Sequence, residues 1–160
     1  MADSAIKLSV LHLRDFWLES FRIAQGDSEK IEAGVPINIE VGMETHKHPS
    51  EEKAFGLKSI FRFGPSSDLE SNDGKTLPYD IEVIVWGDFI FQAEIPLEAM
   101  ELHKQISAPS ILYGIARAFV AQSTAMFSAG KFILPTVRFT ERKTKAIQAK
   151  NKPRKKVSGE

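Results

Sequence analysis

Apolar and polar residues alternate along four stretches of the chain between residues 6 and 95. Side chains two positions apart share one face of a strand, so each stretch predicts a strand with one buried face. Loops rich in Gly, Pro, Ser, Asp and Asn separate the stretches. Because the connections are short enough for antiparallel neighbours, we expect the strands to form a meander. The predicted strands are Ile6–Ile23, Pro36–Glu44, Lys53–Phe63 and Tyr79–Ile95.

The alternation is irregular in two of these strands. In the first, the apolar residues up to Val10 share one parity, whereas those from Leu11 onward fall on both. This change predicts either a bulge or a strand that is buried on both faces. In the fourth, Gly87 and Asp88 interrupt the apolar run, which predicts a bulge or kink at that point.

A different pattern follows residue 96. Residues 97–106 predict a short helix or a loop. Pro109 suits the first turn of a long helix, and Gly130 suits its end. Pro135 cannot continue that helix, so Phe132–Phe139 is predicted to be an extended arm. Strands followed by a helix indicate an α+β domain: a four-stranded antiparallel sheet, a long C-terminal helix and the arm.

Small side chains form a stripe along the predicted helix, in which Gly114, Ala118, Ala121 and Ala125 recur every three or four residues. Such a stripe lets another backbone approach the helix closely. The neighbour is either the chain's own sheet or a second subunit, and the sequence leaves both open. In the second case these four residues are candidates for an oligomer interface.

The charge of the chain is unevenly distributed although its formal net charge is zero. Residues 141–160 hold eight of the 21 basic residues and two of the 21 acidic ones, which leaves an acidic body with a basic tail. We therefore predict one domain, residues 1–140, and a disordered basic tail, residues 141–160. The alternative is that the tail is an arm that touches RNA, an acidic partner or anionic lipid.

Several kinds of chemistry lack their sequence signals. No apolar run approaches the roughly 18 residues of a membrane span, and we expect no signal peptide at the N-terminus. The chain has no cysteine, which is compatible with the reducing cytoplasm, where we expect the protein to be. Neither a nucleophile elbow nor a glycine-rich phosphate loop occurs. His46 and His48 could form a metal pair, but we expect an exposed turn. We expect no enzyme, cofactor or metal.

Aromatic residues are numerous for one sheet covered by one helix. The surplus predicts either an oligomer interface or a groove for apolar ligands or peptides. The candidates for lining such a groove come from the fourth strand and the arm, and they are Trp86, Phe89, Phe91, Phe132 and Leu134.

The predicted helix and arm resemble those of the SecB protein-export chaperone family, in which a helix of this pattern precedes an extended Pro-x-Val-x-Phe segment. Glu82 and Gly87 lie in a stretch that resembles the family's last strand, and His103 falls where the family often has a histidine. Residues 13–21 resemble its first strand loosely, so the resemblance covers roughly residues 6–139. The matching residues of the helix and the arm are Pro109, Ile111, Leu112, Tyr113, Ala116, Arg117, Pro135, Val137 and Phe139.

The resemblance implies an ATP-independent holdase that assembles as a dimer of dimers. Such a protein binds unfolded precursors in apolar grooves and delivers them to the translocase motor, SecA. By residue matching, Glu19 and Glu82 are candidates for docking the motor. The chain departs from the family at Asp80, where an apolar residue is usual, and in its basic rather than acidic tail.

Two alternatives stay open. One is a SecB-like chaperone that is dedicated to a single client, such as the antitoxin of a toxin–antitoxin system. The other is a nucleic-acid-binding module that uses the basic tail, which we favour least.

Overall fold

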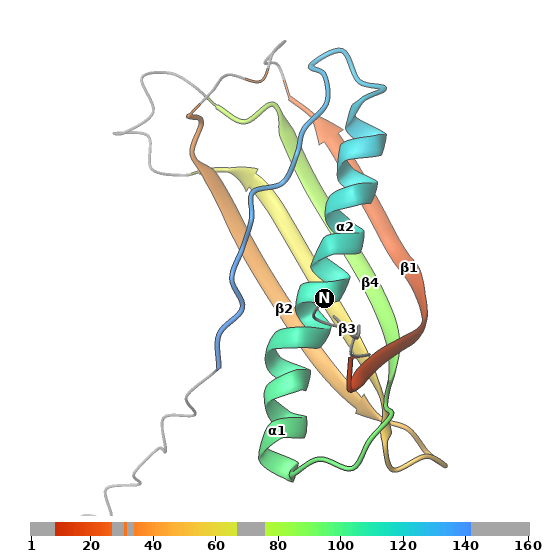
Figure 1. Cartoon of the computed structure of the whole chain (residues 1–160). Helices are drawn as coiled ribbons and strands as arrows, with labels where there is room; N and C mark the ends of the chain where they lie inside the picture. Colours follow the sequence, from red (N-terminus) through yellow and green to blue (C-terminus); the bar gives the residue numbers. More distant parts are fainter. Residues whose placement is uncertain (1–8, 27–30, 32–33, 67–75, 142–160) are drawn as a thin grey trace, which may run out of the picture.

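Four strands form one antiparallel sheet, and helices cover one of its faces (Figure 1). The computed structural model describes residues 9–26, 31, 34–66 and 76–141. The strands are β1 (Leu11–Gln25), β2 (Ile37–Lys47), β3 (Ala54–Pro65) and β4 (Tyr79–Phe91). The helical segments α1 (Leu97–Leu102), η2 (His103–Ser107) and α2 (Ala108–Thr124) follow without a break. The predicted basic tail, apart from residue 141, lies outside the described residues.

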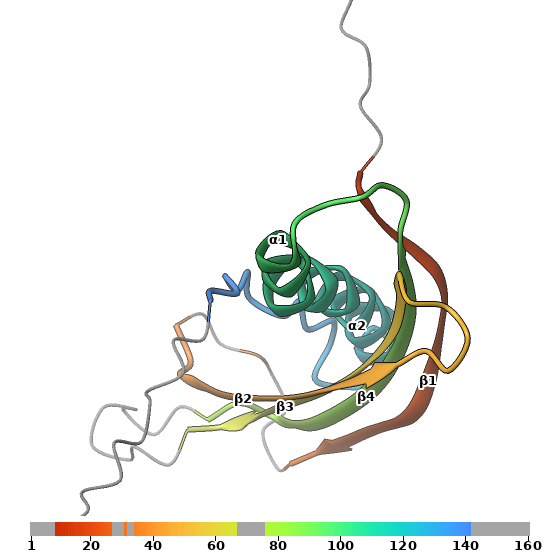
Figure 2. The ribbon, with the colours of Figure 1, turned by 90° about the horizontal axis from the view of Figure 1, so that it is seen from below.

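The strand order is β1-β4-β3-β2, which corrects one part of the prediction. The meander holds for β2, β3 and β4, but β1 pairs with β4 rather than with β2. This is a Greek-key arrangement. The connection from β1 to β2, residues 26–36, is longer than a hairpin loop of about two to five residues, so it can carry the chain across the sheet. Figure 2 shows that the sheet curves around α1 and α2.

Two bulges in β1 explain its shifting parity and confirm that expectation. Arg14 and Glu19 are the extra residues, since the register with β4 shifts at each of them. Each extra residue moves the following side chains to the other parity. As a result one face of β1 stays apolar from Leu11 to Ile23. The residues on that face are Leu11, Leu13, Phe16, Leu18, Phe21 and Ile23.

The interruption predicted at Gly87 and Asp88 is wrong, because β4 pairs with β3 continuously through both residues. Gly87 has another role, since a Cβ atom there would lie 2.5 Å from Phe89 Cε2 and 2.8 Å from Leu112 Cδ2. Leu112 belongs to α2. The glycine therefore lets α2 pack directly on β4.

The core lies between α2 and the face of β3 and β4 that this helix covers. Every second residue of β4, from Tyr79 to Phe91, is buried there. The side chains that α2 contributes include Leu112, Ala116 and Val120, all of which are fully buried. Thus the strict alternation seen in the sequence corresponds to one sheet face under a helix.

The start of the long helix agrees with its prediction, because Pro109 lies in the first turn of α2. The short helix predicted before it is α1, which the π-helical turn η2 joins to α2. A wider turn fits before a proline, which has no N–H and crowds the preceding carbonyl. The helix ends at Thr124 rather than near Gly130. Gly130 instead has a φ of 88° in the turn that leads into the arm.

The arm, residues 131–141, runs along the helix side of the sheet and has no regular secondary structure (Figure 1). Thr124 Oγ1 accepts a hydrogen bond from the Phe132 backbone N–H at 2.8 Å. Tyr113 Oη donates to the Pro135 carbonyl oxygen at 2.6 Å. Phe132 and Leu134 are buried. The extended arm predicted from Pro135 is therefore held against the core. No helix among the described residues is long and apolar enough to cross a membrane.

Candidate functional site

The residues predicted to line a groove lie on opposite sides of the sheet. Phe89 and Leu134 have no exposed surface, while Phe91 and Phe132 are only 2% and 6% exposed. These four side chains belong to the core, and of them only Phe91 borders a cleft, which is described below. Trp86 has the other parity along β4 and lies on the face without helices. The parity of β4 alone separates Trp86 from Phe89 and Phe91.

An aromatic cluster marks the centre of this open face. Trp86 stacks on Trp17 with the ring centroids 5.8 Å apart and the planes 5° from parallel. His46 lies 4.9 Å from Trp86, and the Lys58 ammonium lies 5.5 Å from the indole centroid. Trp17 is 49% exposed. The open face thus carries a flat aromatic surface with a cation beside it.

Glu19, one of the two predicted docking residues, is bound within this cluster. Its carboxylate accepts hydrogen bonds from Trp86 Nε1 and, at 2.9 Å, from Lys58 Nζ. The Trp86 N–H bond, followed by the Lys58 bond, lowers the pKa of Glu19. Glu19 is a bulge residue of β1, and its side chain reaches over β4 to Lys58 on β3. Its charge is already compensated by Lys58.

Glu82, the other predicted docking residue, is also ion-paired. Arg62 Nε donates to Glu82 Oε2 at 2.6 Å, and this bond raises the pKa of Arg62. In register, Glu40, Arg62, Glu82 and Arg22 form a row of alternating charge across all four strands. Opposite charges side by side on one sheet face stabilise each other. Neither predicted docking residue is therefore a free anion for a basic partner.

Arg14, which the sequence did not single out, connects three parts of the fold. Its guanidinium donates to Asp88 at 2.9 Å and to Glu51 at 2.8 Å. These bonds raise the pKa of Arg14, with the Asp88 bond as the larger cause. Glu51 belongs to the turn between β2 and β3, so Arg14 links that turn to β1 and β4. No sequence signal identifies it, because the role depends on the position of the bulge.

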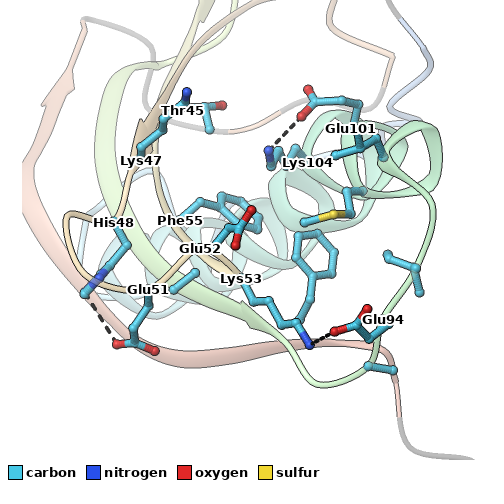
Figure 3. A pocket seen from close by; sticks show the side chains of 16 residues that line it. Thr45, Lys47, His48, Glu51, Glu52, Lys53, Phe55, Glu94, Glu101 and Lys104 are labelled. Carbon is cyan, nitrogen blue, oxygen red and sulfur yellow. Dashed lines mark hydrogen bonds and ion pairs between the residues drawn. The ribbon is translucent and has the colours of Figure 1, made fainter.

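A cleft of about 510 Å³ opens between α1 and the turn that joins β2 to β3 (Figure 3). Its apolar lining includes Phe55, Phe91, Ile95 and Met100, and charged side chains surround it. At one side Lys53 Nζ donates to Glu94 at 2.8 Å, which lowers the pKa of Glu94. Of the predicted groove residues, only Phe91 lines this cleft. We call it the α1 cleft.

At the opposite side of the α1 cleft, Lys104 is held by Glu101 at 2.7 Å (Figure 3). The Lys104 ammonium also lies 5.5 Å from the centroid of the Phe55 ring. A second cleft, of about 620 Å³, lies between the helix and the arm and is lined by Leu102, Ile106, Ser110 and residues 136–141. Both clefts are lined in part by α1 and η2, the helical segments that precede α2.

The stripe of small residues faces away from the sheet. Gly114, Ala118 and Ala125 are exposed, and Ala121 is half-buried. A Cβ atom at Gly114 would meet nothing within 4 Å. The stripe is therefore not the surface that packs on the chain's own sheet, and it is available to another molecule.

The four histidines do not come together. His46 contacts Trp86, whereas His48 lies 3.7 Å from Glu51. His103 is within 2.9 Å of the Ser107 hydroxyl, and His12 is exposed on β1. Within the described part of the chain, no group of three or more His, Asp or Glu side chains could hold a metal ion.

Comparison with known proteins supports the fold. The sequence matches no protein-family model and no curated protein. The structure is similar to that of Mycobacterium tuberculosis Rv1957, a SecB-like chaperone in complex with a ChAD peptide from the Rv1956 HigA1 antitoxin. The TM-score is 0.58 at 16% identity, over 82% of this chain and 93% of that chain.

A protein of unknown function from Streptococcus agalactiae matches with a TM-score of 0.48 and 14% identity, over 79% of this chain and 97% of that chain. The four-stranded antiparallel sheet, the long helix after it and the match to the SecB-like chaperone together show that this chain has a SecB-like fold.

Proposed function

We propose that the protein is an ATP-independent holdase chaperone that binds extended segments of unfolded polypeptides. The observation that carries the proposal is the α1 cleft, an apolar cavity with a charged rim in a SecB-like fold. Such a cleft accepts a large apolar side chain, while the rim accommodates the polar backbone on either side of it.

The ion pairs of the open face favour a chaperone dedicated to one client over one that delivers precursors to the export machinery. A motor that docks on acidic residues needs anions that are free to bind it. Glu19 is compensated by Lys58, and Glu82 by Arg62. That the similar Mycobacterium protein is bound to an antitoxin peptide agrees with this choice.

Assembly into an oligomer belongs to the same proposal. The small-residue stripe is largely exposed, and the helix side of β1 is incompletely covered, with Phe16 40% exposed. We expect Gly114→Leu to shift the assembly toward smaller species in light scattering. Gly114→Ala keeps a small side chain and serves as the matched control. An unchanged mass for Gly114→Leu would remove the stripe from the interface.

The central experiment measures how well the purified protein suppresses the aggregation of an unfolded precursor without ATP. Met100→Glu places a charge in the α1 cleft, so it should weaken suppression, whereas Met126→Glu at an 83% exposed position should not. A folded wild-type protein that fails with every precursor and antitoxin peptide tested would refute the holdase function. Tight SecA binding that Glu82→Lys abolishes would instead support delivery to the export machinery.

A further inference from the structure

The negative charge of the described body is concentrated on the open face of the sheet. The strands place seven carboxylates and four Lys or Arg side chains on this face, whereas the other described residues include six of each. The acidic surplus therefore belongs to the open face. Its carboxylates are those of Asp15, Glu19, Glu40, Glu44, Asp80, Glu82 and Asp88, and its cations are Arg14, Arg22, Lys58 and Arg62.

An aromatic row crosses the centre of the same face, with Trp17 on β1, Trp86 on β4 and His46 on β2. A Cβ atom added at Gly56 of β3 would lie 3.9 Å from the Trp86 ring and 3.7 Å from His46 Cβ, so the glycine leaves the sheet flat where the rings meet. The bond from the Trp86 N–H to Glu19 fixes the larger ring. A flat, exposed indole surface of this kind is suited to stacking with a planar cation such as a guanidinium.

Two carboxylates flank the aromatic row without a cation of their own. In the described part of the chain, neither Asp15 nor Glu44 forms an ion pair with Lys or Arg. Asp15 lies opposite Asp88, a like charge, and Arg14 bonds to Asp88. Glu44 is 61% exposed and has only the His46 ring nearby, at 3.7 Å. Like charges on neighbouring strands destabilise a sheet, so added cations would stabilise this one.

The basic tail carries the opposite charge and begins on the other side of the sheet. Its residues 142–160 hold eight Lys or Arg and one Glu. The arm that leads to it runs over the β2 side of the helix-covered face (Figures 1 and 2). Twelve extended residues span up to about 40 Å, whereas four strands side by side span only about 15 Å. Arg154 can therefore reach the aromatic row, while Arg142 stays beside the arm.

We propose that the basic tail binds across the open face of its own chain, with the Arg154 guanidinium over the Trp17–Trp86 stack and Lys side chains beside Asp15 and Glu44. Weak contacts are sufficient, because a tether of this length gives an effective concentration on the order of millimolar. Any other partner of the open face must then displace the tail. This inference goes beyond the holdase function and does not depend on it, since the α1 cleft lies on the helix side.

Trp fluorescence tests the contact directly, because the only two Trp residues of the chain both lie on the open face. The experiment measures acrylamide quenching of the full-length protein at low and at high salt. High salt should release the tail and raise the quenching constant by about 1.5-fold or more, since Trp17 is 49% exposed without it.

The comparison is a tail-neutral variant of full length, Lys150→Gln/Lys152→Gln/Arg154→Gln/Lys155→Gln/Lys156→Gln. It should have the high quenching constant at both salt concentrations, because its open face stays uncovered. Its core is unchanged, so it should fold as the wild type does. If the wild type showed no response to salt, or if the variant showed the same response, the tail would not cover the open face and the proposal would be wrong.

The site on the body is tested by removing the two flanking carboxylates. Asp15→Asn/Glu44→Gln should reduce the salt response of the quenching constant. Glu52→Gln/Glu98→Gln is the matched control, because it removes the same charge from exposed residues of the turn after β2 and of α1. The control should keep the response of the wild type. Equal responses in both double variants would overturn the placement of the tail beside Asp15 and Glu44.

Two measurements define the contact further. Arg154→Lys keeps the charge but stacks less well, so it should lose part of the salt response, whereas Arg142→Lys should lose none. Equal results for the two would overturn the contact between Arg154 and the indoles. A contact within one chain should also give the same response at every protein concentration. A response that grows with concentration would mean that a second copy supplies the tail, and would refute binding within one chain.

Discussion

The contact between α2 and β4 at Gly87 offers a direct test of how the helix is seated. Replacing Gly87 by Ala adds one methyl group where the nearest atoms would be 2.5 Å and 2.8 Å away. Those atoms belong to Phe89 and Leu112, which are both completely buried and so cannot swing into solvent. The Phe89 ring, the Leu112 side chain or the helix itself must move within a close-packed core.

The expected cost follows from overpacking. Adding a methylene-sized group to a filled core typically destabilises a protein by about 1–3 kcal/mol, so Gly87→Ala should lower the free energy of unfolding by that amount. Denaturant unfolding followed by Trp fluorescence measures it. The double variant Gly87→Ala/Leu112→Ala should be more stable than the sum of the single effects predicts, because removing the Leu112 methyl groups makes room.

Gly56→Ala is the matched control. It also lies within a strand, but its added Cβ would be 3.7 Å from the nearest atom, an ordinary contact, and it points to the open face. It should change the stability by less than about 0.5 kcal/mol, as is usual for a surface substitution. If Gly87→Ala were as stable as Gly56→Ala, the close approach of α2 to β4 would be refuted.

Three other substitutions test the polar contacts. Ser59 Oγ is buried without a hydrogen-bond partner among the described residues, so Ser59→Ala should raise the free energy of unfolding by about 1 kcal/mol, and a loss would reveal a partner. Thr124→Val leaves the buried Phe132 N–H unpaired and should cost about 1–3 kcal/mol, with faster hydrogen exchange in the arm. The pKa of Glu19 is lowered by Trp86, so its contribution is present above the ordinary value of 4.5 and is lost as the pH falls through the folded-state pKa. The difference in Tm between wild type and Glu19→Gln should therefore shrink on acidification, and a constant difference would contradict the pairing.

Hydrophobic patterning predicts individual elements well because it is local. The alternation in β3 and β4 marks the residues that face the helix, and Pro135 marks the arm. The mixed parity of the apolar residues from Leu11 onward indicates a bulge, although it does not show that there are two. By contrast, Gly87 was misread as an interruption, since a glycine in a strand looks the same whether it breaks the ladder or admits a helix.

The candidate binding surfaces were much less predictable. Glu19 and Glu82 look like free surface anions in the sequence, because their partners Lys58 and Arg62 are 39 and 20 residues away along the chain. Trp86 and Phe91 differ in parity, but parity does not show which face of the strand is open; Trp86 lies on the open face and Phe91 lines the α1 cleft. Such pairings exist only once the strands are in register.

The amino-acid order alone was enough to place the strands, the helix, the arm and the small-residue stripe, since each depends on side chains a few positions apart. The tertiary structure decided that β1 lies beside β4, that β2 is the regular edge and that Glu19 and Glu82 form ion pairs with Lys58 and Arg62. The physical reason is that strand neighbours and ion pairs depend on the route of the connections and on the packing of the whole core. Neither strand neighbours nor ion pairs produce a periodic pattern in the sequence.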